Sequence, residues 1–452
     1  MIANLKSYPH YKSSCVEWLG DVPTHWEVRR LKRVASLNPS KTESQAFLTA
    51  DMPVIFLPME RVGADGKIDE KMVSASSVWN GFTYFRRDDV LVAKITPCFE
   101  NGKGACLDSL STVIGFGSTE FHVLRSSPSV LPQFLYRLTA LAEFRHSGAE
   151  EMTGAAGQQR VPQAFVANYP LPLPPLSEQT AIVRYLDHTD ERICHYISSR
   201  ERLIELLEEY RQAVIHHAVT RGLDPDVRLK PSGVEWLGDV PAHWEVRRFK
   251  TIGKNFTNGT TAEQLATGIS DFPVSRIETI STGQITYSKV GYLNESSVIK
   301  SFYLQPDDFL ISHINSYERV GNSARYKGER ALLHGMNLIR ITPLKVIVPN
   351  YLEYLLKSSL FIGSMQRACK PAINQVSVTT AAIKAIQFPL PPLAEQTVIV
   401  RYLNKATADI DAAIDRARRE IELLGEYRTR LIADVVTGKV DVREAAAELS
   451  AV

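Results

Sequence analysis

The residue types that most often carry catalysis or hold a cofactor occur in this 452-residue chain without the spacing that such chemistry needs. His188 and His195 lie seven residues apart on one helical face without an evident third metal ligand, so solvated or packed histidines are favoured. Gly115-Phe116-Gly117 is not followed by the further glycine of a nucleotide-binding loop. Asp307-Asp308 lacks the acidic residue and the lysine that follow in a metal-dependent nuclease. The sequence therefore predicts no catalytic residue, no metal site and no cofactor in this chain.

Composition and charge exclude further classes of protein. The 52 Lys and Arg residues nearly balance the 50 Asp and Glu residues, and 44% hydrophobic with 23% charged residues is typical of globular proteins. No run of apolar residues is long enough to span a bilayer, and the first residues lack the pattern of a signal peptide. The five cysteines form no C-x-x-C pair. We expect a cytoplasmic, non-membrane protein of two or three domains.

The chain contains an internal repeat, which determines how its domains are organised. Residues 16–30 read VEWLGDVPTHWEVRR, and residues 234–248 repeat this segment with one difference. A second pair follows at an offset of 217 residues rather than 218, LPPLSEQ at 173–179 and LPPLAEQ at 390–396, and each continues into IVRYL. Between these paired segments the two copies diverge almost completely. The chain is therefore a tandem duplication of a unit of about 217 residues. The paired segments, here called the frame segments, are nearly identical in the two copies, and the sequence between them differs.

Each LPPL segment predicts the start of a long helix, because the prolines block helix until they end. We predict a first helix over Ser177–Thr220, ~66 Å long at ~1.5 Å per residue, and a second one 217 residues later. A narrow apolar stripe with alternating steps of four and three residues predicts a coiled-coil seam. Its members are Ile182, Leu186, Ile193, Leu203, Leu207, Tyr210 and Val214 in the first helix and Ile399, Leu403, Ile410, Leu424, Tyr427 and Leu431 in the second.

A narrow stripe favours pairing of the two helices with each other, although packing of each helix on its own domain stays open. The other segments mix short β-like runs with helical stretches near residues 131–143 and 348–360, as in mixed α/β (α+β) domains. The sequence thus predicts two mixed α/β domains over residues 1–172 and 225–389. It also predicts two long antiparallel coiled-coil helices within 173–224 and 390–452, in a pseudo-two-fold tandem repeat. The second domain carries a net charge of +6 and the first helix −3, so the domains rather than the helices favour a polyanionic partner.

The paired VEWLGDVP-x-HWEVRR and LPPL-[SA]-EQ-x-x-IVRYL segments, with the EYR-x-x-x-[IL]-x-x-x-V endings near residues 209–219 and 426–436, resemble the specificity (S) subunits of type I restriction–modification enzymes. The resemblance spans most of the chain, twice and in order. It implies two target recognition domains, each of which reads one half of a bipartite, asymmetric site on double-stranded DNA. It also implies helices that set the spacing of the half-sites and dock two modification subunits and the restriction subunits. S-adenosylmethionine, ATP and Mg²⁺ are then expected on those partner subunits.

The residues suited to DNA contact lie in loops after predicted strands, because Arg and Lys bind guanine or phosphate and Asn and Gln bind adenine. The polar turn at residues 153–160 is of a kind that recurs in the family, whereas its counterpart at 370–375 has no glycine, which leaves its geometry open. For each of these residues a solvated surface role is the alternative. The candidates are Lys94, Thr96, Asn101, Lys103, Gln158, Gln159 and Arg160 in the first domain and His313, Asn315, Tyr317, Arg319, Asn322, Arg325, Asn374 and Gln375 in the second.

Two other functions stay open at this stage. The chain could be a recognition fragment or fusion with methyltransferase or nuclease activity of its own, or a coiled-coil adaptor that does not bind DNA. The tryptophans of the frame, Trp18, Trp26, Trp236 and Trp244, are predicted to pack at the entrance of each domain, with docking of a modification subunit as the alternative.

Overall fold

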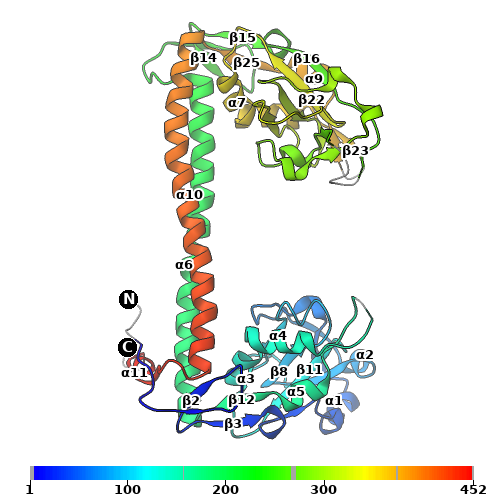
Figure 1. Cartoon of the computed structure of the whole chain (residues 1–452), viewed down its shortest axis with the longest axis vertical. Coiled ribbons are helices and arrows are strands. Elements are labelled where there is room, and N and C mark those ends of the chain that lie inside the picture. The colour runs from blue at the N-terminus through cyan, green and yellow to red at the C-terminus, as the bar shows by residue number, and fades with distance from the viewer. Residues whose placement is uncertain (1–4, 156, 266–270, 373–374, 450–452) are drawn as a thin grey trace. The chain divides into compact units, whose positions relative to one another are not determined.

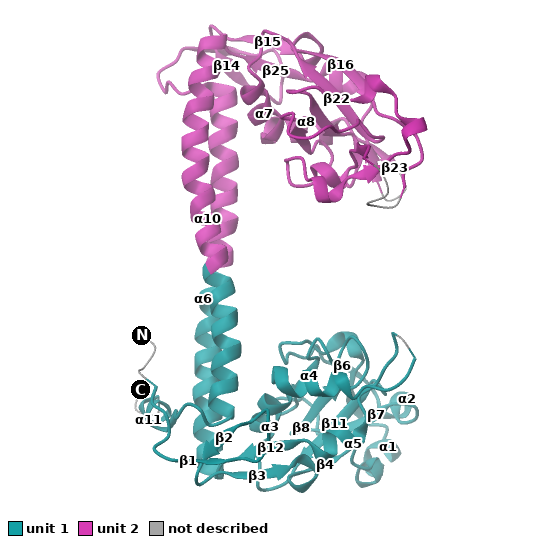
Figure 2. Ribbon diagram, in the orientation of Figure 1, with its two compact units in different colours: residues 1–199, 420–452 teal, residues 200–419 magenta. Residues whose placement is uncertain are grey.

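The computed structural model describes residues 5–155, 157–265, 271–372 and 375–449 and divides into two compact units. Unit 1 consists of residues 1–199 and 420–452, and unit 2 consists of residues 200–419 (Figure 2). Each unit combines one mixed α/β domain with a part of each long helix. The sequence placed the segment boundaries at 172/173, 224/225 and 389/390, outside the long helices, whereas the divisions between the compact units fall inside the helices.

The domain of unit 1 is built on a four-stranded antiparallel sheet in the order β4-β11-β8-β9, whose central strands β8 and β11 are labelled in Figure 1. Its strands are β4 (Ala35–Leu37), β11 (Phe121–Ser126), β8 (Asp89–Ala93) and β9 (Gly104–Cys106). A second sheet, in the order β6-β5-β10-β7, contains β6 (Lys71–Ser74), β5 (Pro53–Leu57), β10 (Ile114–Gly117) and β7 (Thr83–Arg86). The α-helices in the described part of the domain are α1 (Gln45–Thr49), α2 (Ala75–Val78), α3 (Pro132–Thr139), α4 (Ala142–Glu150) and α5 (Gln163–Asn168).

The frame segments form short pairs of antiparallel strands in each unit. In unit 1, β1 (Tyr11–Ser13) pairs with β2 (Asp21–Pro23), and β3 (Glu27–Arg30) pairs with β12 (Pro170–Leu173). In unit 2, β13 (Leu229–Pro231) pairs with β14 (Asp239–Pro241), and β15 (Glu245–Arg248) pairs with β25 (Gln387–Leu390). The frame segments therefore form the same two strand pairs in both units.

Unit 2 repeats the central sheet with β16 (Gly253–Asn258), β22 (Leu338–Pro343), β19 (Phe309–Ser312) and β21 (Ser323–Arg325) in that order. A three-stranded sheet in the order β20-β24-β23 joins β20 (Ile314–Asn315), β24 (Gln375–Ser377) and β23 (Lys370–Ala372). In place of the second sheet of unit 1 stands a small pair, β17 (Pro273–Val274) and β18 (Gly291–Tyr292), with irregular turns around it. The helices are α7 (Pro349–Lys357), α8 (Ser359–Arg367) and α9 (Thr380–Ala385).

The long helices are α6 (Leu176–Arg221) and α10 (Leu393–Val436), followed by the short α11 (Arg443–Glu448). The predicted limits of the first helix are correct to within one residue at each end. In unit 2, Glu208 pairs with Arg418 at 3.1 Å and Arg211 pairs with Asp411 at 2.7 Å. Because the partner number falls as the α6 number rises, the two helices run antiparallel, as predicted.

A buried glutamine fixes the start of each long helix to its domain. The Gln179 amide is fully buried; its Nε2 donates to the carbonyls of Ser129 (3.0 Å) and Pro174 (2.9 Å), and its Oε1 accepts from the Leu131 N–H (2.8 Å). Gln396 in unit 2 forms the same three bonds, with the carbonyls of Val346 and Pro391 and the N–H of Val348. Since Leu131 and Val348 are the residues just before α3 and α7, the EQ of the repeated segment ties each long helix to the first helix of the domain.

The core of unit 1 draws on sequence segments far apart in the chain. Trp26 and Ile182 are fully buried in one cluster with Leu431, Val435 and Val442, which come from the end of α10 and the segment after it. The Trp26 Nε1 donates to the buried carboxylate of Glu178 at 3.0 Å. These contacts show that the predicted packing role holds for Trp26 in unit 1.

The other tryptophans of the frame divide between packing and exposure. Trp244 is fully buried in the core of unit 2, as predicted. Trp18 stacks on Tyr169, with ring centroids 5.3 Å apart. Trp236 is 38% exposed and lies under the guanidinium of Arg367, 4.7 Å from the ring centroid.

The predicted seam is correct at most positions and wrong at two. Ile182, Leu186, Ile193, Ile399, Leu403, Ile410 and Leu431 are buried, and Leu207, Val214, Leu424 and Tyr427 are partly buried. Leu203 and Tyr210 are instead 36% and 60% exposed. A strict seven-residue repeat drifts by about 20° per heptad on a helix of 3.6 residues per turn, so it leaves the buried face after several heptads. Ile204, Glu208, Arg211 and Ile215 occupy that face instead.

Among the described residues, no helix combines the length and the apolar character that crossing a bilayer requires.

Candidate nucleic-acid interface

The structure brings the two predicted polar loops of unit 1 together. The loop of residues 94–103 follows β8, and the turn of residues 153–160 lies beside it through a bridge between Ile95 and Arg160. The Val161 N–H donates to the Lys94 carbonyl at 2.8 Å. The Thr96 hydroxyl also lies 3.1 Å from the N–H of Gln159, from which it accepts a hydrogen bond. Loops that are about sixty residues apart in sequence therefore form one junction at the end of the central sheet.

Unit 2 forms the same junction from different residues. The loop of residues 313–322 follows β19, and its first part, β20, pairs with β24. The Val378 N–H donates to the His313 carbonyl at 2.9 Å, just as Val161 does to Lys94. The sequence left the geometry of the glycine-free turn open; the described residues on either side of residues 373–374 form the antiparallel strands β23 and β24. Asn374 lies outside the described residues.

The two loops also close in the same way. The Ala93 N–H donates to the Lys103 carbonyl at 2.9 Å, and the Ser312 N–H donates to the Asn322 carbonyl at 2.8 Å. Lys94 and His313 therefore occupy equivalent positions, and so do Lys103 and Asn322. We call these two equivalent sites the loop junctions of unit 1 and unit 2.

In the unit 1 junction some of the candidate residues are held by neighbours. The Lys103 Nζ donates to the Met59 carbonyl at 3.1 Å. Arg160 forms two 2.8 Å hydrogen bonds with the carboxylate of Glu120, which hold the pKa of Glu120 below its usual range. Asn101 and Gln158 are exposed, and Lys94, Thr96 and Gln159 are half-buried.

The unit 2 junction has a similar division. Asn315 is internally bonded, because its Nδ2 donates to the Ser312 hydroxyl at 3.1 Å and its Oδ1 accepts from the Ser316 N–H at 2.9 Å. His313 is 7% exposed, and burial lowers its pKa, so its ring is neutral near pH 7. Among the predicted candidates of this junction, Tyr317, Arg319 and Gln375 face solvent.

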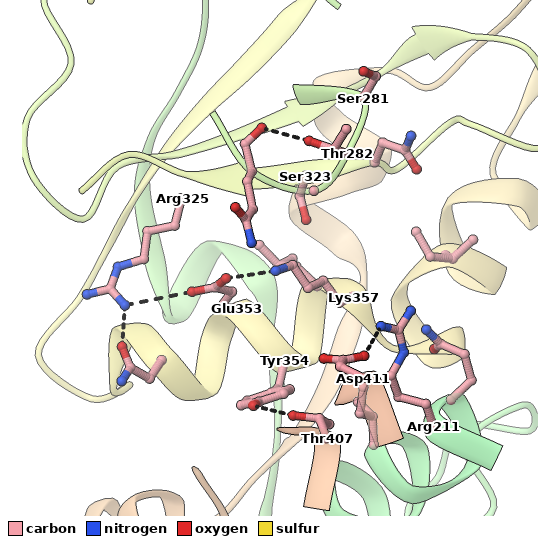
Figure 3. Close-up of a pocket in the computed structure, with 18 of the residues that line it drawn as sticks. Arg211, Ser281, Thr282, Ser323, Arg325, Glu353, Tyr354, Lys357, Thr407 and Asp411 are labelled. Atoms are coloured by element: carbon pink, nitrogen blue, oxygen red, sulfur yellow. Dashed lines mark hydrogen bonds and ion pairs between the residues drawn. The ribbon is translucent and has the colours of Figure 1, made fainter. Parts of the chain in front are cut away.

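Arg325 and Asn322 line a different feature, a polar hollow of about 840 Å³ within unit 2 (Figure 3). The hollow lies between α7, the turn of residues 281–284 and the long helices. The Arg325 Nε donates to Asp307 at 2.9 Å, and its side chain is only 16% exposed. On the opposite wall, Arg211 pairs with Asp411. The ion pairs of the wall satisfy the Arg325 charge, so this side chain supports the domain.

Sequence reasoning missed the residues that hold these candidates. Glu120 and Asp307 bind Arg160 and Arg325, and the Gln366 Nε2 donates to the Tyr317 carbonyl at 3.2 Å. In the sequence, Asp307 stood out only as part of the Asp307-Asp308 pair, which lacks the rest of a nuclease motif. The choice of candidates rested on side chains that bind guanine, adenine or phosphate, so neither carboxylate gave a signal. Within the described part of the chain, no group of His, Cys, Asp or Glu side chains could hold a metal ion.

The long helices also expose apolar side chains that the units leave uncovered. In the unit 2 part these are Leu206 (46% exposed), Tyr210 (60%), Val398 (53%) and Tyr402 (46%). In the unit 1 part, Leu423 is 46% exposed. Leu206 and Tyr210, like Val398 and Tyr402, stand four residues apart and so share a helical face, and contiguous apolar surface of this kind suits contact with another protein.

Comparison with known families identifies both halves of the chain. A family model described as "Type I restriction modification DNA specificity domain" matches residues 23–205 and again residues 241–423. Together these two matches cover most of the sequence.

Individual relatives agree with that match. A Methanocaldococcus jannaschii protein, provisionally named a type I restriction enzyme MjaX specificity subunit, is 38% identical over 205 residues, which is 44% of this chain and 47% of that protein. The type I restriction enzyme EcoAI specificity subunit of Escherichia coli is 34% identical over 197 residues, 41% of this chain and 33% of the relative. The chain thus aligns with half or less of the length of each of these relatives.

A solved structure shares the fold. It is described as the "structural basis underlying complex assembly and conformational transition of the type I R-M system". One of its chains aligns with a TM-score of 0.70 at 19% identity and covers 92% of this chain and 98% of its own length.

Proposed function

We infer the function of this chain from its family: it belongs to the type I restriction–modification DNA specificity family, whose domain model matches both of its halves. We propose that it is the sequence-specificity subunit of a type I restriction–modification complex and that it has no catalytic role of its own. Each unit binds one half of a bipartite, asymmetric site on double-stranded DNA.

One observation carries this proposal. Each unit builds an equivalent loop junction at the end of its own central sheet, and the side chains of the two junctions differ. The backbone bonds of Val161 to Lys94 and of Val378 to His313 are equivalent, whereas the side chains at these junctions differ. Phosphate contacts position a protein on DNA, and side chains at base edges supply specificity. Two loop junctions with the same backbone arrangement and different side chains suit a protein whose two units dock on DNA in the same way but recognise different base sequences.

The helices supply the second part of the proposal. They set the spacing of the half-sites and dock two modification subunits, with the restriction subunits attached to the complex. Support comes from the exposed apolar side chains on α6 and α10, among them Tyr210 and Tyr402, which suit a protein contact. Adenine-N6 methylation with S-adenosylmethionine, and the ATP- and Mg²⁺-dependent steps of restriction, belong to these partners. A subunit that acts on cellular DNA in this way works in the cytoplasm.

Methylation mapping of host DNA tests the proposal. We expect one bipartite adenine motif to be present with the intact gene and absent after its deletion. Complementation with a Tyr317→Ala, Arg319→Ala chain tests the assignment of halves, because these residues are exposed in the junction of unit 2. The double variant should relax one half of the motif and leave the other half unchanged. A chain that only links proteins would change no motif, and methyl transfer by the purified chain alone would contradict the non-catalytic role.

A further inference from the structure

The ion pair of Arg160 and Glu120 lies at the centre of the unit 1 junction. Glu120 stands in the turn just before β11, and its carbonyl accepts from the Lys94 N–H at 2.9 Å. The strands β8 and β11, which lie side by side in unit 1 (Figure 2), carry Lys94 and Glu120 at neighbouring ends. Arg160 reaches the same place through its bridge to Ile95. Three separate segments of the chain are therefore joined at this pair.

The geometry of the pair leaves one edge of the arginine unoccupied. A guanidinium has five N–H groups in a plane. The Arg160 Nε and Nη2 each donate to one Glu120 oxygen at 2.8 Å, and Nη1 reaches the Gln158 carbonyl at 3.4 Å. One N–H on Nη1 and one on Nη2 remain, and they lie parallel on the outer edge. Among the described residues, none accepts a hydrogen bond from that edge.

The outer edge is also accessible. The Arg160 side chain is 45% exposed, whereas that of Glu120 is 23% exposed. Lys94 adds positive charge beside the pair, and the hydrogen bonds from Arg160 lower the pKa of Glu120, so the carboxylate is charged at neutral pH. Two parallel N–H donors match the O6 and N7 acceptors of guanine in the major groove. An arginine held by a carboxylate loses less side-chain freedom on binding than one that moves freely.

We propose that Glu120 is a positioning residue for DNA reading, which holds the guanidinium of Arg160 so that its outer edge contacts a guanine in the half-site bound by unit 1. This inference rests on the proposed function. The contact is specific to unit 1, because the residue that pairs with Ile314 in unit 2, at the place of Arg160, is Ser377. The half-site of unit 2 therefore serves as an internal standard in every experiment.

The test uses the modification complex assembled from this chain and its modification subunits, with a duplex library that is randomised in both half-sites. Sequencing of the methylated fraction gives the base preference at each position. Arg160→Lys keeps the charge but loses the planar pair of donors. We expect it to reduce the preference for guanine at one position by roughly 5- to 150-fold. Glu120→Gln should reduce the preference at the same position and by a smaller factor, because glutamine still accepts one bond.

Glu17→Gln is the matched control. It removes the same charge from an exposed residue of unit 1 that lies outside both loops of the junction, so it should leave every base preference unchanged. Unchanged preference in both Arg160→Lys and Glu120→Gln, with or without a lower melting temperature, would overturn the proposal and make the pair a structural clasp. If Glu120→Gln also loses the preference in the unit 2 half-site, the variant is misfolded, and Glu120→Asp with Arg160→Lys then decides. Failure of the proposed function is distinct, because the unaltered complex would then show no bipartite motif.

Discussion

The buried amide of Gln179 offers a direct test of how the long helix is tied to the recognition domain. Methionine has a similar volume but can neither donate nor accept the three hydrogen bonds of this amide. Ser129 is exposed, so its carbonyl can turn to water, whereas the Pro174 carbonyl and the Leu131 N–H lose their partner where water has little access. Because a buried group without a partner costs roughly 1–3 kcal/mol, we expect Gln179→Met to lower the free energy of unfolding by about 3 kcal/mol.

Denaturant unfolding followed by circular dichroism measures this change, and hydrogen exchange locates it. Protection should fall at the start of α3 and in the first turns of α6, the two segments that Gln179 joins. Thr180→Met, at the next and exposed position, is the control and should change stability by less than about 0.5 kcal/mol. Gln396→Met should repeat the effect in unit 2, because that amide makes the equivalent bonds. A loss no larger in Gln179→Met than in Thr180→Met would refute the reasoning.

Three further predictions concern charge, DNA and length. Asp190 binds Arg428 at 3.0 Å and also pairs with Arg137; burial raises its pKa, and the two guanidinium groups more than offset this, so the pKa is held below its ordinary value. The stability from this cluster is therefore present above about pH 4 and lost as the pH falls through the folded-state pKa. Asp190→Asn should cost about 3 kcal/mol at pH 7, and the gap to the unaltered chain should close as the pH falls through the folded-state pKa of Asp190; a gap that does not depend on pH would contradict this. Lys94→Ala should weaken DNA binding and reduce the slope of log K against log salt by about 1, so equal slopes across a salt series would remove Lys94 from the interface. One heptad added within residues 203–214 and one at the facing part of α10 lengthens the pair by about 10 Å. The spacer of the methylated motif should then grow by about three base pairs, and recovery of the unaltered motif would exclude the ruler role.

Much of the frame was predictable because the duplication marks it. The paired LPPL segments located the long helices to within one residue, since proline blocks a helix for a local, chain-based reason. The buried stripe was predicted well near the helix starts and failed at Leu203 and Tyr210. A heptad pattern assumes 3.5 residues per turn along the whole helix, whereas a straight helix has 3.6. The buried face therefore passes from Leu203 and Tyr210 to Ile204 and Arg211.

For the candidate interface, the sequence predicted the types of side chain but not which of them lie together or are already hydrogen-bonded within the domain. The sequence placed Lys94 and Arg160 in two separate loops, and only the bridge between the loops shows that they share one site. Which of the polar side chains are already bonded within the domain also depends on three-dimensional neighbours. Arg325 was a reasonable candidate by type, but Asp307 and the walls of the hollow hold it.

The composition of the unit 1 core has a consequence for how the protein is made. Trp26 and Ile182 pack with Leu431, Val435 and Val442, which the ribosome adds at least 240 residues later. At a synthesis rate of roughly 5–20 residues per second, the first domain waits roughly 10–50 s with that apolar face open. Unit 2 is one continuous stretch of chain, so all of its residues exist before those of unit 1 are complete. The half of the protein that is translated first is therefore the last that can finish folding, and during that interval it depends on protection from aggregation.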